Sequence, residues 1–194
     1  MAKDFFACNG CIGHGTAVRE EHDYYATPPE AVHKLFDSEY FTPPEVVWEC
    51  ACGGGHIAEA LKEHGVQSYC TDLIDRGYGT GGVDFLKSDL IYNVDTILTN
   101  PPYKYATDFV LHALDLLPEQ GRVIMLLKIQ FLEGKDRMKR LYTHYPPWGI
   151  FVHSSRVRCA LNADFENAHV NAVCYTWYEW RKGFNGHPQI YWLK

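Results

Sequence analysis

Two kinds of apolar spacing alternate along the chain. Short runs rich in aliphatic and aromatic residues predict strands at 46–52, 67–73, 95–99, 121–127, 150–154 and 172–180. Helical patterns predict helices at 28–36, 56–64, 106–117 and, with a basic surface, 135–144. The run over 121–127 is nearly all apolar, as is typical of a strand buried on both faces of a parallel sheet. This alternation predicts a doubly wound α/β sheet whose ligand binds at the carboxyl ends of the strands.

Glycine and proline residues mark the ends of several elements. Thr27 is placed to cap the first helix, whose first turn holds Pro28, and Gly65 ends the second helix. A glycine-rich segment over 77–82 stands where a full crossover helix is usually expected. A third strand is expected after this segment, with Asp84 and the following phenylalanine at its tip.

Length and composition favour one domain. The chain has 194 residues, 46% of them apolar, which is enough for one core of ordinary size. Residues 1–22 have no apolar period and are interpreted as an arm, which leaves residues 23–194 as the domain. No run approaches the roughly 20 apolar residues that cross a bilayer, and the first residues lack a secretory signal pattern. We therefore expect a cytoplasmic protein without a membrane segment.

The cysteines favour reduced thiols over a metal centre. There are seven, an odd number, and several lie inside apolar runs. Cys8 and Cys11, with His14 nearby, resemble half of a zinc site, but a structural zinc site needs four ligands and no second well-spaced pair exists. We therefore expect no metal.

The charge is unevenly distributed. The net charge of −6 argues against a general nucleic-acid binder. Between Arg122 and Arg158, however, eight Lys or Arg residues stand against Glu133 and Asp136, so this stretch carries +6 and the remainder −12. Such a basic face on an acidic protein suits phosphate contacts, although a solvated helix face explains 135–140 equally well. The eight cations are Arg122, Lys128, Lys135, Arg137, Lys139, Arg140, Arg156 and Arg158.

A glycine turn follows the first predicted strand. Gly53-x-Gly55-x-x-Ala58 fits the dinucleotide-binding pattern, in which glycines let the backbone approach a ligand at a helix N-terminus. Dehydrogenases, methyltransferases and bare flexible turns all share this pattern. Asp72 ends the next strand, where a carboxylate accepts hydrogen bonds from ribose hydroxyls, although a surface acid is the alternative. Asp84 and Phe85 offer a further acceptor and an aromatic face for adenine, although a single Phe is more often a core residue.

The motif Asn100-Pro101-Pro102-Tyr103 is the most informative in the chain. The lone pair of an exocyclic ring amine is delocalised, which makes the nitrogen a poor nucleophile. The Asn100 side-chain oxygen and the Pro101 carbonyl can accept both amino hydrogens, and the prolines hold this geometry because each ring fixes φ. Tyr103 can stack on the base. A simple proline turn would explain the prolines but not their neighbours.

These motifs make the chain resemble the amino-group DNA methyltransferases, chiefly the adenine-N6 class. The small enzymes of phages and prophages are the most similar, and the resemblance covers about residues 20–194. It implies a Rossmann-like class I methyltransferase fold, with a mostly parallel seven-stranded sheet and helices on both faces, and S-adenosylmethionine as the cofactor. The motifs that carry it are Thr27-Pro28-Pro29, Glu49-Cys50-Ala51-Cys52-Gly53-Gly54-Gly55, Asp72, Asp84-Phe85, Asn100-Pro101-Pro102-Tyr103, Phe131-Leu132-Glu133-Gly134, Ser155-Arg156-Val157 and Tyr175-Thr176-Trp177-Tyr178-Glu179-Trp180.

The resemblance also implies roles for individual residues. The catalytic loop is Asn100, Pro101, Pro102 and Tyr103. The cofactor residues are Thr27, Pro28, Glu49, Ala51, Cys52, Gly53, Gly55, Asp72, Leu73, Asp84, Phe85 and Asn100. With the base flipped out of its stack onto Tyr103, the substrate phosphates would contact Lys128, Lys135, Arg137, Arg156 and Arg158. No catalytic His is needed, because the step depends on orientation and a dry pocket more than on a strong base.

The chain departs from the larger members of the family, which carry a separate target-recognition domain. Only 134–147, 161–168 and the arm remain to contact the target sequence. Adenine in DNA is the expected substrate, and cytosine N4, an RNA base or a protein glutamine are alternatives with the same amine chemistry. A nicotinamide-dependent oxidoreductase or a catalytically silent binding module are alternatives of other classes. The oligomeric state stays open.

Overall fold

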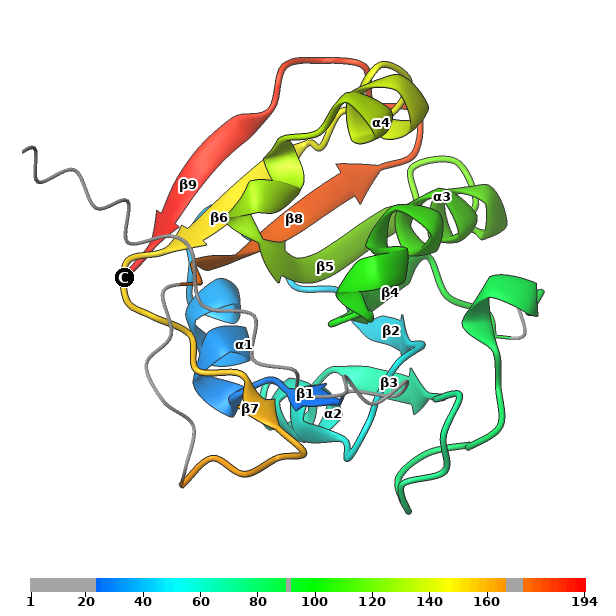
Figure 1. Ribbon diagram of the computed structural model, residues 1–194, viewed down its shortest axis with the longest axis vertical. Coiled ribbons are helices and arrows are strands. Elements are labelled where there is room, and N and C mark those ends of the chain that lie inside the picture. The colour runs from blue at the N-terminus through cyan, green and yellow to red at the C-terminus, as the bar shows by residue number, and fades with distance from the viewer. Residues whose placement is uncertain (1–23, 90–91, 167–172) are drawn as a thin grey trace, which may run out of the picture.

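The computed structural model describes residues 24–89, 92–166 and 173–194, which form a sheet between two layers of helices (Figure 1). Seven strands form the sheet in the order β3-β2-β4-β5-β8-β6-β9, and β1 and β7 form a separate pair. The strands are β1 (Tyr25–Ala26), β2 (Val46–Glu49), β3 (Gln67–Cys70), β4 (Thr96–Thr99), β5 (Arg122–Lys128), β6 (Gly149–His153), β7 (Ala160–Leu161), β8 (Tyr175–Arg181) and β9 (Gln189–Leu193). The helices are α1 (Pro29–Phe36), α2 (His56–Glu63), α3 (Ala106–Leu116) and α4 (Lys135–Arg137). Four further helical turns are η1 (Phe85–Lys87), η2 (Tyr103–Tyr105), η3 (Ile129–Leu132) and η4 (Met138–Tyr142).

All strands of the large sheet except β8 run in one direction. β3, β2, β4 and β5 pair in parallel, and β8 is antiparallel to both β5 and β6. β9 then pairs in parallel with β6. The prediction of a mostly parallel, seven-stranded α/β sheet is therefore confirmed.

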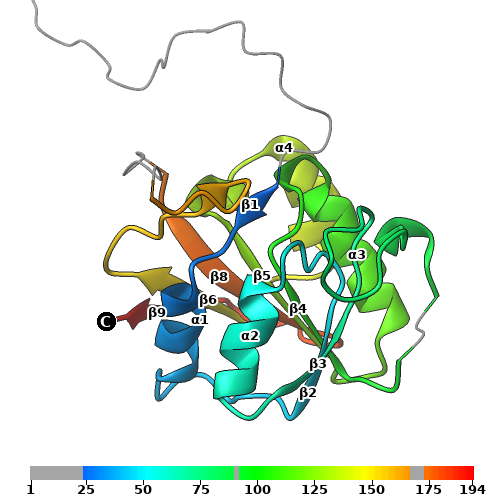
Figure 2. The same cartoon turned by 90° about the horizontal axis from the view of Figure 1, so that it is seen from below.

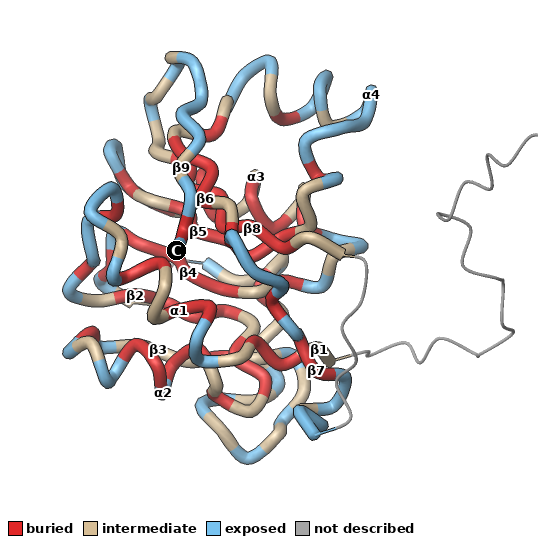
Figure 3. The backbone as a smooth tube through the Cα atoms, turned by 90° about the vertical axis from the view of Figure 1, so that its left-hand side faces the viewer, coloured by how far each residue is buried: buried red, intermediate tan, exposed pale blue. Residues whose placement is uncertain are grey.

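Each face of the sheet is covered by its own helices. α1 and α2 lie on one face, and α3 lies on the other (Figure 2). Alternate residues of one strand divide between the faces, since Leu98 packs with the α1 and α2 layer and Ile97 with the α3 layer. The buried backbone runs through the centre of the molecule between exposed loops (Figure 3). The buried sheet accounts for the apolar runs that predicted its strands.

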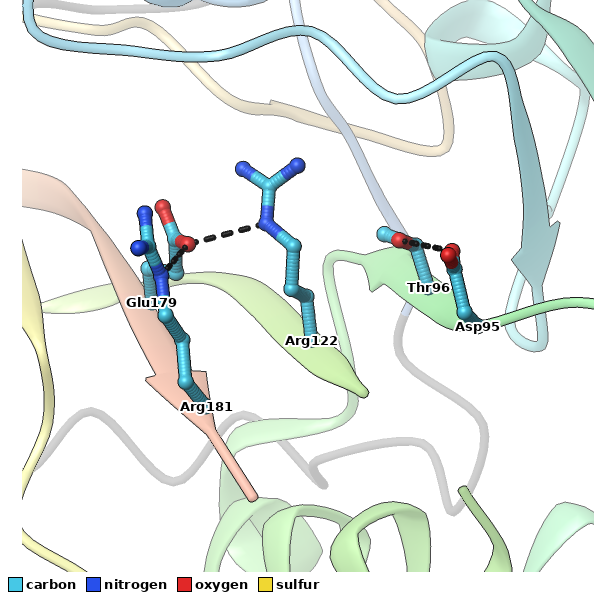
Figure 4. A network of polar contacts seen from close by, with 5 residues as sticks. All are labelled: Asp95, Thr96, Arg122, Glu179 and Arg181. Carbon is cyan, nitrogen blue, oxygen red and sulfur yellow. Dashed lines mark hydrogen bonds and ion pairs between the residues drawn. The ribbon is translucent and has the colours of Figure 1, made fainter. Parts of the chain in front are cut away.

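A buried ion network connects β5 and β8 at the start of β5. Glu179 of β8, fully buried, accepts from Nε of Arg122 at 2.9 Å and from Nε of Arg181 at 2.7 Å (Figure 4). Two cations compensate the buried carboxylate, as a buried charge requires. Arg122 therefore has a structural partner, and it lies at the edge of the sheet opposite the carboxyl ends of the parallel strands.

Several predicted elements differ in the structure. Among the described residues, no strand runs directly into Asp84. The Asp84 side chain instead accepts the Leu86 N–H at 3.2 Å and caps η1. The seventh strand is instead β9, which the sequence pattern missed because four of its five residues are not buried. Thr27 does not cap the first helix, because the helix starts at Pro29 and Thr27 lies too early for the capping position. The helix predicted at 135–144 is divided between α4 and the π-helical turn η4.

The predicted arm over 1–22, with its cysteine pair, lies outside the described residues. No helix among the described residues has the length and apolar character that a membrane crossing requires. Those residues also contain no cluster of three or more His, Cys, Asp or Glu side chains able to hold a metal.

Candidate active site

The candidate site lies where three neighbouring parallel strands end. Glu49 ends β2, Asp72 follows β3, and Asn100 follows β4. Because these strands are parallel neighbours, their carboxyl ends meet at one edge of the sheet, as ligand sites of doubly wound folds require. The sequence motifs from separate parts of the chain are thus brought together.

The glycine turn between β2 and α2 needs glycine at two positions. Gly53 has φ +55° and Gly55 has φ +82°, a left-handed backbone conformation that residues with a side chain rarely adopt. A Cβ on Gly53 would lie 2.1 Å from Cε2 of Tyr24, and one on Gly55 would lie 2.4 Å from the Tyr78 ring. Two tyrosine rings therefore pack directly on the turn.

Asp72 holds the glycine turn in place. Its Oδ2 accepts the Gly53 N–H at 2.8 Å, and its Oδ1 accepts the Ile74 N–H at 2.9 Å. Each oxygen keeps a further lone pair, so the carboxylate can still accept hydrogen bonds from ribose hydroxyls. Leu73 beside it is half exposed.

Glu49 is a buried carboxyl group with an unused acceptor. The residue is 1% exposed, and Oε2 has no hydrogen-bond partner among the described residues. Burial raises the pKa of Glu49 well above its ordinary value, and the nearby Asp72 charge raises it further, against the Ala58 N–H, which lowers it. A cationic ligand group at this position would relieve both effects. Ala51 and the buried Cys52 continue the chain from Glu49 into the turn.

The orientation of the Asn100 amide is fixed by two partners from the start of the chain. Its Nδ2 donates to the Tyr25 carbonyl at 3.1 Å and to the Thr27 hydroxyl at 3.0 Å. A carbonyl only accepts, so the nitrogen must face Tyr25 and the oxygen must face away. That oxygen, Oδ1, is buried without a partner among the described residues. Pro101, whose carbonyl would be the second acceptor, is also buried.

Tyr103 lies among aromatic and cationic groups. Its ring centroid is 6.4 Å from that of Tyr25 and 5.8 Å from that of Tyr175, and Nζ of Lys128 lies 4.9 Å from the ring centre. Burial raises the pKa of Tyr103, so its hydroxyl stays protonated at neutral pH. The ring borders a small hollow of about 150 Å³ at the ends of β5 and η3. The hollow is lined by Tyr103, Ala106, Leu127, Lys128, Gln130, Phe131 and Arg137.

Asp84 and Phe85 have structural partners. Asp84 accepts the Leu86 N–H and pairs with Lys87 at 2.7 Å. Phe85 is 2% exposed, and its ring packs against Trp48 and Phe109 at centroid distances of 5.3 and 4.9 Å. Phe85 is therefore a residue of the hydrophobic core, and its contact with an adenine stays a prediction.

The basic residues of the predicted phosphate face separate into groups. Lys128 and Arg137 border the hollow at Tyr103, and Lys135 is exposed on α4. Arg156 and Arg158 instead line a separate cavity beside α1. Nε of Arg137 donates to the Phe131 carbonyl at 2.8 Å and to the Glu133 carbonyl at 3.0 Å, so this side chain braces η3. Arg140 pairs with Asp108 and Asp136, which reduces the local positive charge.

Sequence reasoning missed the tyrosines that precede Thr27. The Tyr24 hydroxyl accepts the Gly54 N–H at 2.9 Å and lies 2.9 Å from Nδ1 of His56, and the Tyr25 carbonyl holds Asn100. β1 pairs with β7, which brings this segment over the site. The signal was the aromatic pair before the Thr-Pro-Pro motif, but only tertiary structure shows its partners.

Comparison with known proteins gives similarity in structure alone. No protein-family model matches the chain, and no curated protein matches it in sequence. A protein assigned as a hemolysin from Streptococcus thermophilus is similar in structure, with a TM-score of 0.61 and 10% identity over 88% of this chain and 71% of the other. A protein assigned as a class I S-adenosylmethionine-dependent methyltransferase from Listeria monocytogenes is also similar, with a TM-score of 0.55 and 13% identity. That match covers 92% of this chain and 67% of the other.

The methyltransferase subunit of a type I restriction-modification system from Streptococcus thermophilus is also similar, with a TM-score of 0.58 and 13% identity. The match covers 89% of this chain but only 48% of that subunit. These structures show that the fold is the Rossmann-like fold of class I methyltransferases.

Proposed function

We propose that this protein transfers a methyl group from S-adenosylmethionine to an exocyclic amino nitrogen of a nucleic-acid base, foremost N6 of adenine in DNA. The observation that carries the proposal is the Asn100 amide. Its nitrogen is bound by Tyr25 and Thr27, and its oxygen is buried without a partner among the described residues. An acceptor left in this way calls for a donor from a substrate.

An amino group of a base supplies such donors. One amino hydrogen would bind Asn100 Oδ1 and the other the Pro101 carbonyl, which draws electron density onto the nitrogen. Tyr103 would hold the flat face of the base, since stacking on an aromatic side chain stabilises any base. The loop therefore suits an amine on a ring better than a hydroxyl group, which brings one hydrogen.

The cofactor supplies a methyl group bonded to a positively charged sulfur. The residues present fit its other groups. Glu49, with a buried acceptor lacking a partner, fits the ammonium group, and Asp72 fits the ribose hydroxyls. Thr27 and Pro28 border the methionine end in this proposal. The glycine turn with Ala51, Cys52, Gly53 and Gly55, followed by Leu73, would line the rest of the cofactor. The assignment of Asp84 and Phe85 to its adenine stays a prediction, because both side chains have structural partners.

The reaction balances without a strong base. When bound, the cofactor would give its methyl group to the amine nitrogen and leave as the neutral sulfide with the electron pair of the broken bond, and the nitrogen would release one proton to solvent. The protein's part is to orient the amine and exclude water, for which Asn100, Pro101 and Tyr103 suffice.

Three features support a DNA substrate. A protein of similar structure is, by its name, the methyltransferase subunit of a type I restriction-modification system. Lys128 lies beside Tyr103, where a strand phosphate would follow a flipped base. Arg158 lies farther along the same edge, after β6. This chain spans about half of the restriction-modification subunit.

The test is mass spectrometry of nucleosides from unmethylated DNA and from RNA after incubation with the protein and S-adenosylmethionine. We expect N6-methyladenine in the DNA and its loss in Asn100→Ala. Asn185→Ala, the same change at an exposed residue between β8 and β9, is the matched control. Methylated cytosine or RNA would move the substrate to that class. Absence of any methylated base, with S-adenosylhomocysteine still bound by calorimetry, would refute the nucleic-acid substrate.

A further inference from the structure

A cavity of about 560 Å³ adjoins the candidate active site, between the first turn of α1 and the chain that follows β6. We call it the α1 cavity, and its volume lies within the range of about 300–1,000 Å³ typical of small-molecule sites. Pro28 in its wall follows Thr27, which holds Asn100. Phe165, also in the wall, packs on His56 of the glycine turn at a centroid distance of 5.3 Å. The cavity thus borders both parts of the site.

The α1 cavity is positively charged in an acidic protein. Lys34, Arg156 and Arg158 line it, against one acidic residue, Glu30. Nζ of Lys34 is held by the Ser155 hydroxyl at 2.8 Å and by Glu30 at 3.1 Å. Arg158 is exposed and makes no hydrogen bond or ion pair with the part of the chain that the structure describes. The cavity therefore offers positive charge to an anionic group such as a phosphate.

His153 gives the α1 cavity a polar side chain without a hydrogen-bond partner in the part of the chain that the structure describes. The residue is 5% exposed, and neither ring nitrogen has a partner among the described residues. Burial, together with the Lys34 charge, lowers the pKa of His153 to about 4, against a smaller opposing effect of Glu30. The ring is therefore neutral at pH 7, with one donor and one acceptor. Buried groups of this kind call for a ligand with a complementary donor and acceptor.

The rest of the wall is apolar and aromatic. Pro28, Ala31, Val157 and Phe165 provide it. An aromatic ring stabilises a base by stacking, whereas the flexible cations favour a phosphate. Among the ligands that the proposed reaction brings to this edge, a nucleotide is the one that matches the charge, the neutral imidazole and the aromatic wall together.

We propose that the α1 cavity binds one nucleotide of the substrate strand beside the methylated base, with its phosphate at Arg158 and Lys34 and its base edge at His153. This inference rests on the proposed function and adds a site that reads a neighbouring base. It offers a source of sequence preference within the described residues of this chain.

The first experiment measures binding without turnover. Protein saturated with S-adenosylhomocysteine is titrated calorimetrically with the four deoxynucleoside 5′-monophosphates, with deoxynucleosides and with inorganic phosphate. We expect one monophosphate to bind more tightly than its nucleoside and than phosphate, and Arg158→Gln to weaken it about tenfold. Lys62→Gln, an equal change of charge at an exposed side chain of α2, should leave binding unchanged. Equal binding of phosphate alone, or nucleotide binding seen only when S-adenosylhomocysteine is left out, would overturn the proposal.

The second experiment examines the base edge. DNA duplexes with randomised bases around a single target are methylated and sequenced, and we expect a preference at one neighbouring position. His153→Phe, which keeps the ring shape without hydrogen-bonding groups, should abolish that preference, and His153→Gln should retain part of it. Thermal unfolding shows whether the variants are folded. If His153→Phe methylates with the same neighbour preference as the parent protein, this inference is overturned and the proposed function stays intact. Absence of methylation by the parent protein would refute the proposed function itself.

Discussion

Replacing Glu49 by Gln should stabilise the protein and weaken cofactor binding at the same time. The Glu49 carboxyl group is 1% exposed, and burial raises its pKa well above the usual value of 4.5. In the unfolded chain it ionises near the usual value, so between the two pKa values the folded state holds one proton more. The unfolding free energy then falls as pH rises through this window, by about 1.4 kcal/mol per pH unit. Glutamine has the same shape and no charge, so it removes this dependence.

The assay is urea unfolding of the cofactor-free protein, followed by tryptophan fluorescence from pH 5 to pH 8. The stability gain of Glu49→Gln over the parent protein should grow by about 1.4 kcal/mol per pH unit until the raised pKa is reached. Glu45→Gln, the same change at an exposed residue just before β2, is the matched control. A difference between Glu49→Gln and the parent that stays constant with pH would refute the reasoning.

The second half of the same prediction concerns the cofactor. If the Glu49 carboxylate binds an ammonium group, its loss removes a charged hydrogen bond of about 1.5–3 kcal/mol, so the Kd for S-adenosylhomocysteine should rise about tenfold to a hundredfold. In the parent protein, binding should release a proton and therefore tighten as pH rises toward the raised pKa. Unchanged binding by the stabilised variant would separate Glu49 from the cofactor site.

Three further predictions follow from other parts of the structure. Tyr103→Ala should raise the KM for DNA about tenfold or more, because base stacking on an aromatic side chain is worth about 1–3 kcal/mol, with the Kd for S-adenosylhomocysteine unchanged; an unchanged KM would remove Tyr103 from the base site. Glu179→Ala should lower the unfolding free energy by about 3–5 kcal/mol in urea, because Arg122 and Arg181 lose their shared buried partner, and a loss under about 1 kcal/mol would contradict this. Burial lowers the pKa of His153 to about 4, so the unfolded chain takes up a proton at a higher pH than the folded protein does. The unfolding free energy should therefore fall as pH falls from about 6.5 toward 4. His153→Gln should flatten this dependence in urea unfolding, and an unaltered slope would argue against it.

The sequence predicted most of the sheet because its strands are buried on both faces. The apolar runs at β2, β4, β5, β6 and β8 reflect this burial, so they indicate the strands directly. β1 and β7, with two residues each, form only because they meet one another, and no period in the sequence shows that. β9 lies at the sheet edge, where exposed residues break the apolar run.

The site was predictable where a motif is local and not where a partner is distant. Asn100, Pro101 and Tyr103 stand together in sequence, so their common role was visible. Thr27 has the side chain of a helix cap, but Pro28 and Pro29 move the helix start beyond it, and its hydroxyl binds Asn100 instead. Tyr24 meets the glycine turn across about thirty residues, a contact that only the folded chain creates.

The place of β8 between β5 and β6 decides when the sheet is completed during synthesis. Residues 175–181 pair along the whole length of β5, yet they follow the glycine turn and the catalytic loop in the chain. Until they have left the ribosome, the apolar edge of β5 stays unpaired, and an open edge of this kind invites association with other chains. Pairing over such a sequence separation is also slow. A chain truncated before residue 175 should therefore contain every motif of the candidate site and still aggregate, because the strand that closes the centre of its sheet follows all of these motifs in the chain.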